Sequence, residues 1–325
     1  MYRFLSRILR FAVVCLLGAA CSAHASGYPH KPVVIVVPFA AGGATDQLAR
    51  LLGQRLGEVL GQPFIIENKP GAGTVIAAAG VARAAADGYT LFLAPNSTLT
   101  LNPALRTQIP YDPIKSYSFI GQVATLDMVL VANINEPERT LQDMLERARS
   151  RPQSLSYGSF GVGTTANFGG EMLKAAAHVD IMHVPFNGST PNLTAVIGNQ
   201  IPLAVDTIVA TLPFIRAGKM RAIAILSPHR PALLPDVPTV AESGFPGFEL
   251  MSWLALIAPA GIPEPVRLTL DTALQSVLAE ANMQKQLRNL GLTPAYTPGV
   301  DVLAKIRKEL PLMQKVAASA HMPTQ

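Results

Sequence analysis

The chain has 325 residues, of which 49% are hydrophobic and 14% charged, and its formal net charge is +5. Disordered chains carry more charge and fewer apolar residues, so this composition excludes them, and the length is that of about two domains. The mean hydropathy of +0.30 points toward a membrane transporter. The longest apolar run covers only residues 11–20, however, and a membrane span needs about 20 residues. The mature protein is therefore predicted to be soluble.

The N-terminus has the pattern of a signal peptide. Three arginines precede the apolar run, and residues 23–25 (Ala-His-Ala) supply the small residues that signal peptidase recognises. We predict export to the periplasm, with a signal peptide over residues 1–25 that is cleaved after Ala25. A lipidated Cys21 is the alternative, although Gly18 stands where lipoprotein signals usually carry Leu. Cleavage would leave 23 basic and 21 acidic residues, a net charge of +2, and no cysteine for a disulfide, a nucleophile or a metal site.

Short apolar runs alternate with helical patterns along the rest of the chain, as in βα units around a mostly parallel sheet. The first run is rich in β-branched residues, which is typical of a strand buried on both faces. The pattern predicts strands over Val33–Val37, Phe64–Ile66, Tyr89–Ala94, Met128–Ala132, Leu155–Ser159, Ile181–Val184, Leu203–Asp206, Arg221–Leu226 and Glu249–Ile257. Helices are predicted between them, including one that ends at Gly61, one over Thr74–Ala86, one that a capping box opens at Thr140, and three that begin near Pro265, Asn282 and Val300.

Two Pro-rich passages, residues 95–113 and 228–238, enclose the central block of strands and helices. This arrangement predicts an α/β protein with two lobes, each a mostly parallel sheet flanked by helices. The first lobe would comprise residues 26–127 and 229–325, and the second residues 128–228.

Several common site motifs are absent from the sequence. Tyr157 stands where a nucleophile elbow around Ser159 would need glycine, and no phosphate-binding P-loop occurs. His178, Asp180 and His183 lack the one-turn spacing of a helical pair of metal ligands. No cluster of Lys or Arg indicates nucleic acid. We therefore predict no catalytic residue, no metal and no cofactor.

The segment Gly161–Ala166 follows a predicted strand and opens a helix, and it fits the relaxed dinucleotide fingerprint Gly-x-Gly-x-x-Ala. Asp180 lies near the position of a ribose-binding acid. It precedes the next strand rather than ending it, however, and export removes the chain from the usual nicotinamide pool. Backbone N–H groups at a helix N-terminus can equally bind another anion.

A glycine loop of this kind occurs twice, over residues 39–46 and 159–165, once in each predicted lobe. Ligands of open α/β sheets bind at the carboxyl ends of strands, so two helix N-termini facing one cleft could hold a carboxylate without arginine. The alternative is two ordinary turns, capped by Thr45 or Asp46 in the first and by Thr164 in the second.

Motifs along the whole mature chain resemble one family. They are Pro38–Gly43 with Asp46, Glu67–Gly73, Ala86–Leu91, Tyr111–Pro113, Tyr157–Gly163, His183–Phe186, Leu234–Thr239 and Ala258–Gly261. In these the chain resembles the Bug-type periplasmic solute-binding receptors of tripartite tricarboxylate transporters. The resemblance implies a two-lobed periplasmic-binding-protein fold of type II-like topology. It also implies a receptor that closes on a small carboxylate, either a dicarboxylate, an amino acid or an aromatic acid, and delivers it to the membrane permease subunits of such a transporter.

The glycine loops, the strand ends and the resemblance together predict a ligand site. Backbone N–H groups around Gly42–Gly43 and Val162–Thr165 would bind the carboxylate, with hydroxyl groups assisting and Phe39 shielding one side. Asp46 and Asp206 either cap structure or contact the ligand. The full set is Phe39, Ala41, Gly42, Gly43, Asp46, Asn96, Ser97, Ser159, Val162, Gly163, Thr164, Thr165, Asn167 and Asp206.

Two other functions stay open at this point. A periplasmic α/β enzyme could bind a nucleotide at the Gly161 loop, and a sensing receptor could dock on a sensor protein instead of a permease. Asn167, Asn187 and Ala195 depart from residues that are frequent in the family, which bears on the identity of the ligand more than on the fold.

Overall fold

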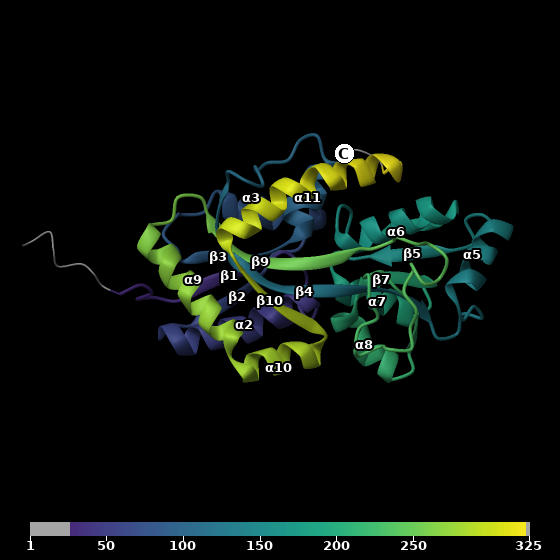
Figure 1. Cartoon of the computed structure of the whole chain (residues 1–325), viewed down its shortest axis with the longest axis horizontal. Coiled ribbons are helices and arrows are strands. Elements are labelled where there is room, and N and C mark those ends of the chain that lie inside the picture. The colour runs from purple at the N-terminus through teal and green to yellow at the C-terminus, as the bar shows by residue number, and fades with distance from the viewer. Residues whose placement is uncertain (1–26, 323–325) are drawn as a thin grey trace, which may run out of the picture.

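The computed structural model describes residues 27–322 of the chain. The predicted signal peptide and its cleavage site lie outside the described residues. Two α/β halves stand side by side along the long axis of the molecule, joined by long strands that run between them (Figure 1). The strands follow the order β2-β1-β3-β9-β4-β7-β5-β6, and β10 and β8 also pair with β4. The predicted two-lobed α/β fold is confirmed.

The first sheet begins with three parallel strands connected by helices. Its elements here are β1 (Val33–Val37), α2 (Ala44–Leu60), β2 (Phe64–Asn68), α3 (Val75–Ala82) and β3 (Thr90–Pro95). Leu48, Leu52 and Leu56 of α2 are buried against this sheet, because they recur at helical spacing on one face. The helix ends at Gly61, whose φ of 71° is the left-handed conformation that glycine adopts most easily.

The second sheet repeats the strand–helix alternation. Its elements are α5 (Leu141–Ser150), β5 (Ser156–Ser159), α6 (Thr165–Ala177), β6 (Met182–Pro185), α7 (Ser189–Ile197), β7 (Leu203–Thr207), α8 (Ile208–Arg216) and β8 (Met220–Ile225). The predicted capping box of α5 is confirmed: the Thr140 side chain accepts a hydrogen bond from the Asp143 N–H, and the Asp143 carboxylate accepts one from the Thr140 N–H.

Strand β4 (Tyr117–Asn133) belongs to both sheets. Residues 117–127 pair with β9 (Met251–Pro259), and residues 128–133 pair with β7 and β8. The remaining elements are α9 (Glu264–Ala279), α10 (Ala281–Leu290), β10 (Leu292–Pro298) and α11 (Gly299–Ser319), with a π-helical turn η2 (Ser97–Leu101) and α4 (Asn102–Leu105) after β3. A single strand therefore carries the chain from one sheet into the other.

Helix α11 also connects the two halves. It runs along one edge of the molecule from the first half toward α6 (Figure 1). Val302 and Ile306 near its start pack in a core cluster of the first sheet, whereas Ala317 near its end packs in the core of the second. No helix within residues 27–322 combines the length and apolarity that crossing a membrane requires.

Three sequence predictions need correction. Strand β4 starts at Tyr117 rather than Met128, because Gly121 and the buried Gln122 interrupt its apolar pattern. Strand β10 was not predicted, since it contains two prolines; it is an edge strand, where proline is tolerated. The pairing is mixed rather than mostly parallel: β4 runs antiparallel to β7, β8, β9 and β10, as β3 does to β9.

Candidate functional site

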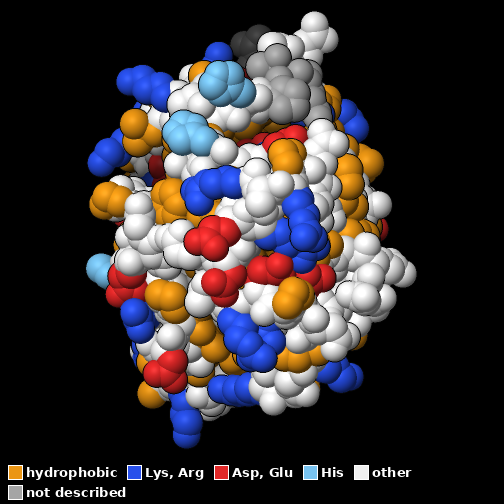
Figure 2. All heavy atoms as spheres, turned by 90° about the vertical axis from the view of Figure 1, so that its right-hand side faces the viewer, with side chains coloured by type: hydrophobic (Ala, Val, Ile, Leu, Met, Phe, Trp, Pro, Cys, Tyr) orange, Lys and Arg blue, Asp and Glu red, His pale blue; other side chains and the backbone are white. Residues whose placement is uncertain are grey.

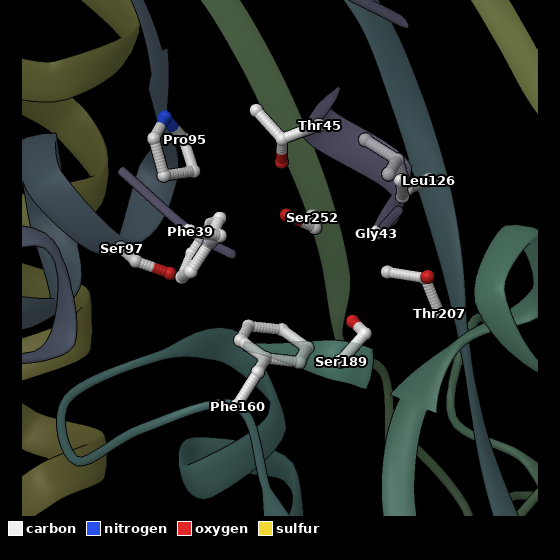
Figure 3. A pocket seen from close by; sticks show the side chains of 11 residues that line it. Phe39, Gly43, Thr45, Pro95, Ser97, Leu126, Phe160, Ser189, Thr207 and Ser252 are labelled. Atoms are coloured by element: carbon white, nitrogen blue, oxygen red, sulfur yellow. The ribbon is translucent and has the colours of Figure 1, made fainter. Parts of the chain in front are cut away.

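A narrow pocket with a cavity of about 20 Å³ lies where the two sheets meet, and in this structure it has room for about one water molecule. Side chains from both halves point into it, with hydroxyl groups and two phenyl rings facing the centre (Figure 3). Its lining side chains are almost fully shielded from solvent, so this is the closed form of an interlobe site. The lining residues are Phe39, Gly43, Ala44, Thr45, Pro95, Ser97, Leu126, Phe160, Ser189, Thr207 and Ser252.

The first turn of α2 supplies the free hydrogen-bond donors of the pocket. Gly43 is the N-cap of this helix in an extended conformation and provides no side chain to cap it. Among the described residues, the N–H groups of Gly43, Ala44 and Thr45 have no acceptor. A helix leaves its first N–H groups unpaired, and here they line a buried pocket. Such groups are suited to bind a carboxylate.

Two further helices begin at the pocket. Ser189 is the first residue of α7, and Thr207 is the N-cap of α8, where its hydroxyl group accepts a hydrogen bond from the Ala210 N–H. Each helix N-terminus carries a partial positive charge, and none of the lining residues is Lys, Arg or His. The α2 side of the pocket is therefore electropositive without a cationic side chain, whereas the carboxylate of Asp206 lies at the N-termini of α7 and α8.

Two aromatic rings enclose the pocket from opposite halves. Phe39 comes from the first glycine loop and Phe160 from the second, and their ring centroids lie 5.3 Å apart at an interplanar angle of 75°. This edge-to-face contact joins the two loops and presents apolar surface to a ligand (Figure 3). The shielding role predicted for Phe39 agrees with this position.

The hydrogen bonds of the Asp46 side chain are all to protein groups in or next to the first glycine loop. Its carboxylate accepts hydrogen bonds from the Gly42 N–H (2.9 Å), from the Arg50 guanidinium and from the Asn68 amide. Burial raises the pKa of Asp46, but these donors outweigh burial and lower it below the usual value. Gly42, with a φ of 89°, is held in a turn that Asp46 closes. The geometry supports the structural role of Asp46 over a ligand contact.

Asp206 lies at the end of β7, directly behind the pocket wall, and is fully buried. Its carboxylate accepts hydrogen bonds from the Ser189 hydroxyl (2.7 Å), the Asn192 amide (2.9 Å) and the Thr207 N–H (2.8 Å). Burial raises the pKa of Asp206 to about 6, although these donors and the Thr207 hydroxyl (3.5 Å) work against that rise. Ser189 and Thr207 line the pocket, so Asp206 is one side chain away from a ligand.

The second glycine loop uses its donors within the protein. The Gly161 N–H donates to Ser159, the Gly163 N–H to the Asn167 side chain, and the Thr165 N–H to the Ser97 hydroxyl in the other half. Thr164 caps α6 through its hydroxyl group, as the alternative interpretation of this loop expected. Of this loop only Phe160 lines the pocket, so in the closed form these three N–H groups are not available to a ligand.

Asn96, which precedes Ser97 in the chain, also forms a contact between the halves. Its side-chain oxygen accepts hydrogen bonds from the hydroxyl groups of Thr165 (2.9 Å) and Ser252 (2.9 Å). On the opposite side of the pocket the Thr190 hydroxyl donates to the Ala41 carbonyl group (2.8 Å). The contacts of Thr165 with Asn96 and of Thr190 with Ala41 cross the boundary between the halves and stabilise the closed pocket.

Ser159, His183 and Asn167 form a buried polar network beside the second glycine loop. The Ser159 hydroxyl lies 2.7 Å from His183 Nε2, and the other ring nitrogen of His183 lies 3.3 Å from the Asn167 amide nitrogen. The spacing is that of a nucleophile and its base. Ser159 is fully buried, however, and does not line the pocket. Burial lowers the pKa of His183 to about 4, so the ring stays neutral at pH 7.

Three of the predicted residues, Phe39, Gly43 and Ser97, line the pocket. The others lie behind it or along the boundary between the halves: Ala41, Gly42, Asp46, Asn96, Ser159, Val162, Gly163, Thr164, Thr165, Asn167 and Asp206. Sequence analysis missed the other eight lining residues, which are Ala44, Thr45, Pro95, Leu126, Phe160, Ser189, Thr207 and Ser252. Thr207 and Ser189 each lie at the start of a helix that follows a strand, and this pattern could have predicted their place at the pocket. Ser252 lies inside a strand, where no sequence pattern indicates a pocket residue.

Within residues 27–322 no group of three or more His, Cys, Asp or Glu side chains could hold a metal ion. The face of the second half in Figure 2 mixes basic and acidic side chains rather than gathering basic ones in one patch.

Residues 48–316 match the family model of a tripartite tricarboxylate transporter family receptor. The chain belongs to this family. Over 315 residues it is 35% identical to a UPF0065 protein of Bordetella pertussis, with 96% of this chain and 97% of that protein covered. The resemblance seen in the sequence motifs is thereby confirmed, and the family is one of solute-binding receptors.

Solved structures of similar proteins agree over nearly the full chain. The periplasmic binding protein BugD superposes with a TM-score of 0.88 at 33% identity, covering 92% of this chain and all of that one (100%). Rpa4515 of R. palustris, solved with adipate, gives 0.88 at 33% identity, with 91% and 99% covered. MatC of Rhodopseudomonas palustris, solved with malate, gives 0.84 at 33% identity, with 89% and 99% covered.

The interactions of Asp46 predict the effect of Asp46→Asn. The substitution removes the ion pair with Arg50 and the acceptor of the Gly42 N–H, and should lower the free energy of unfolding by about 1–3 kcal/mol. Because the folded-state pKa is lowered, this stabilisation is complete above about pH 4, the pKa of an unfolded Asp, and is lost as the pH falls through the folded value. Urea unfolding at pH 7 and pH 3 measures it. Unchanged stability at pH 7 with weakened ligand binding would instead make Asp46 a ligand contact.

Proposed function

We propose that this chain is a periplasmic receptor that captures a small carboxylate between its two lobes and delivers it to the permease subunits of a tripartite tricarboxylate-type transporter. The observation that carries the proposal is the set of three unpaired N–H groups at the start of α2, facing a buried pocket without a cationic side chain. Malate and adipate are the ligands in the MatC and Rpa4515 structures, and both are carboxylates. No catalytic step is needed for this function.

The lobes of this receptor would be residues 26–127 with 229–325, and residues 128–228. The partners of β4 support this division, because they change between Asp127, which pairs with β9, and Met128, which pairs with β7. A ligand that touches both lobes favours their closure. The contacts of Thr165 with Asn96 and of Thr190 with Ala41 would form on closing.

Export and cleavage after Ala25 belong to the same proposal. They rest on the arginines, the apolar run and the Ala-His-Ala segment near the N-terminus, and on a family that includes periplasmic binding proteins. The permease partner rests on the family alone.

A thermal-shift screen of the purified mature protein should single out small carboxylates. Binding to the native state alone stabilises it by about 2.7 kcal/mol when the free ligand is at a hundredfold excess over the Kd. Carboxylates should therefore raise the Tm by several degrees, while sugars, neutral amides and nicotinamide nucleotides leave it unchanged. If only nucleotides raise the Tm, the chain is a nucleotide-binding protein and the receptor proposal fails.

Replacing Ala44 with proline tests the N–H groups themselves. Ala44 is the first residue of α2, where proline is tolerated, and the extended backbone of Gly43 suits a residue that precedes proline. Ala44→Pro removes one donor from the pocket and puts ring carbons in its place, so calorimetry should find carboxylate binding weakened at least a hundredfold. The Tm without ligand should change little.

Ala281→Pro is the matched control for this variant. Ala281 is the first residue of α10, its N–H has no acceptor among the described residues, and Glu280 before it is extended. It lies outside the pocket, so this variant should bind carboxylates like the wild type. Normal affinity in a folded Ala44→Pro protein would show that α2 does not hold the ligand.

A further inference from the structure

Asp206 is a buried acidic side chain without a cationic partner. Its relative exposure is 0%, and among the described residues it takes part in no ion pair. All four of its donors are neutral: the Ser189 hydroxyl, the Asn192 amide, and the N–H and hydroxyl groups of Thr207. The N-termini of α7 and α8 give this carboxylate partial positive charge but no full counter-charge, so a positive group brought near it would still be attracted.

No other ionisable group compensates this charge. The elements packed against β7 are β4, β5, α6, α7 and α8. Helix α7 has no ionisable side chain; those on the other four are Tyr117, Asp127, Tyr157, Glu171, Lys174 and Arg216. Burial raises the pKa of Asp206, and the hydrogen bonds from Ser189, Asn192 and Thr207 work against that rise.

The hydrogen bond from Ser189 extends the influence of Asp206 into the pocket. Because the Ser189 hydroxyl donates its single proton to the ionised carboxylate, its oxygen presents only lone pairs to a ligand. Ser252 is arranged in the same way, since its hydroxyl donates to the side-chain oxygen of Asn96. The α2 side of the pocket thus offers N–H donors, and the Ser189 and Ser252 oxygens offer acceptors.

We propose that Asp206 is a positioning residue that makes the pocket selective for carboxylates bearing an ammonium group. The ligand carboxylate would lie at the first turn of α2, and its ammonium group would donate to Ser189 in front of the buried negative charge. This inference rests on the proposed function, because it concerns the same pocket. A hydroxyl group could donate to Ser189 too, but it brings no charge and would gain less.

Because Asp206 titrates, the affinity for ligands with an ammonium group and the affinity for ligands with negative charge alone should change in opposite directions with pH. Burial raises the pKa of Asp206 in the free protein to about 6. An ammonium ligand favours the ionised form, lowers this pKa on binding, and so binds more tightly as the pH rises through 6. A ligand with negative charge alone favours the protonated form, so Asp206 weakens its binding over the same rise.

Calorimetry between pH 5 and pH 8 with succinate, L-malate and L-aspartate tests the proposal. These ligands share one carbon chain and carry hydrogen, hydroxyl or ammonium at the same carbon. At pH 8 aspartate should bind at least tenfold more tightly than succinate, with malate between them. Between pH 8 and pH 5 aspartate should lose about tenfold in affinity, since each pH unit below the pKa of Asp206 is worth a factor of ten. Propionate, L-lactate and L-alanine form the same series for a shorter chain.

Asp206→Asn removes the charge and keeps the shape. The variant should bind aspartate and succinate with similar affinity and a flat ratio across pH, and comparing each ligand between the two proteins cancels the ligand's own ionisation. Asp127→Asn is the control, because burial also raises the pKa of Asp127 but it does not line the pocket. It should retain the wild-type preference and pH profile.

Each outcome decides a different point. A wild-type protein that binds both series without preference for the ammonium ligand, or with a flat pH profile, overturns the inference and leaves the receptor function intact. The same holds if neither series binds while another carboxylate from the screen does. If no carboxylate binds at all, the proposed function fails as well. Should circular dichroism find Asp206→Asn unfolded, the opposite pH profiles of aspartate and succinate in the wild type decide alone.

Discussion

The convergence of helix N-termini on one pocket is the constraint on which the rest of the site depends. Helices α2, α7 and α8 begin there, and the lining residues include no Lys, Arg or His. Asp206 already lies at the N-termini of α7 and α8, whereas the Gly43, Ala44 and Thr45 N–H groups of α2 lack an acceptor among the described residues. A carboxylate ligand would supply that acceptor between the two halves, and this couples binding to the approach of the two sheets. The hydrogen bonds of Asn96 with Thr165 and of Thr190 with Ala41 can form only once the halves meet.

Most of the fold could be predicted from the sequence, because local patterns determine most of its elements. The β-branched run at Val33–Val37, the helix that ends at Gly61 and the capping box at Thr140 each depend on neighbouring residues only. The first part of β4 and all of β10 depend on distant partners. Gln122 within β4 is satisfied by the Ala295 carbonyl group and by Lys305, and no local pattern indicates either contact.

The site was only partly predictable for the same reason. The first glycine loop could be found, since a strand, a glycine turn and a helix predict free N–H groups at one place. The second loop has the same pattern, yet Ser159, Asn167 and Ser97 accept the hydrogen bonds of its N–H groups. Ser97 belongs to the other half of the molecule, so the sequence around Gly161 cannot reveal that contact. Ser252 lines the pocket because β9 lies beside β4, a pairing across more than a hundred residues.

A crystal structure of the mature protein with a bound carboxylate from the thermal-shift screen tests the central claim most directly. The account predicts one carboxylate group within hydrogen-bonding distance, about 2.7–3.2 Å, of the Gly43, Ala44 and Thr45 nitrogen atoms, with the two halves closed around it. A carboxylate bound instead to the N–H groups of Gly161 and Gly163, or to a basic side chain outside this pocket, would contradict it.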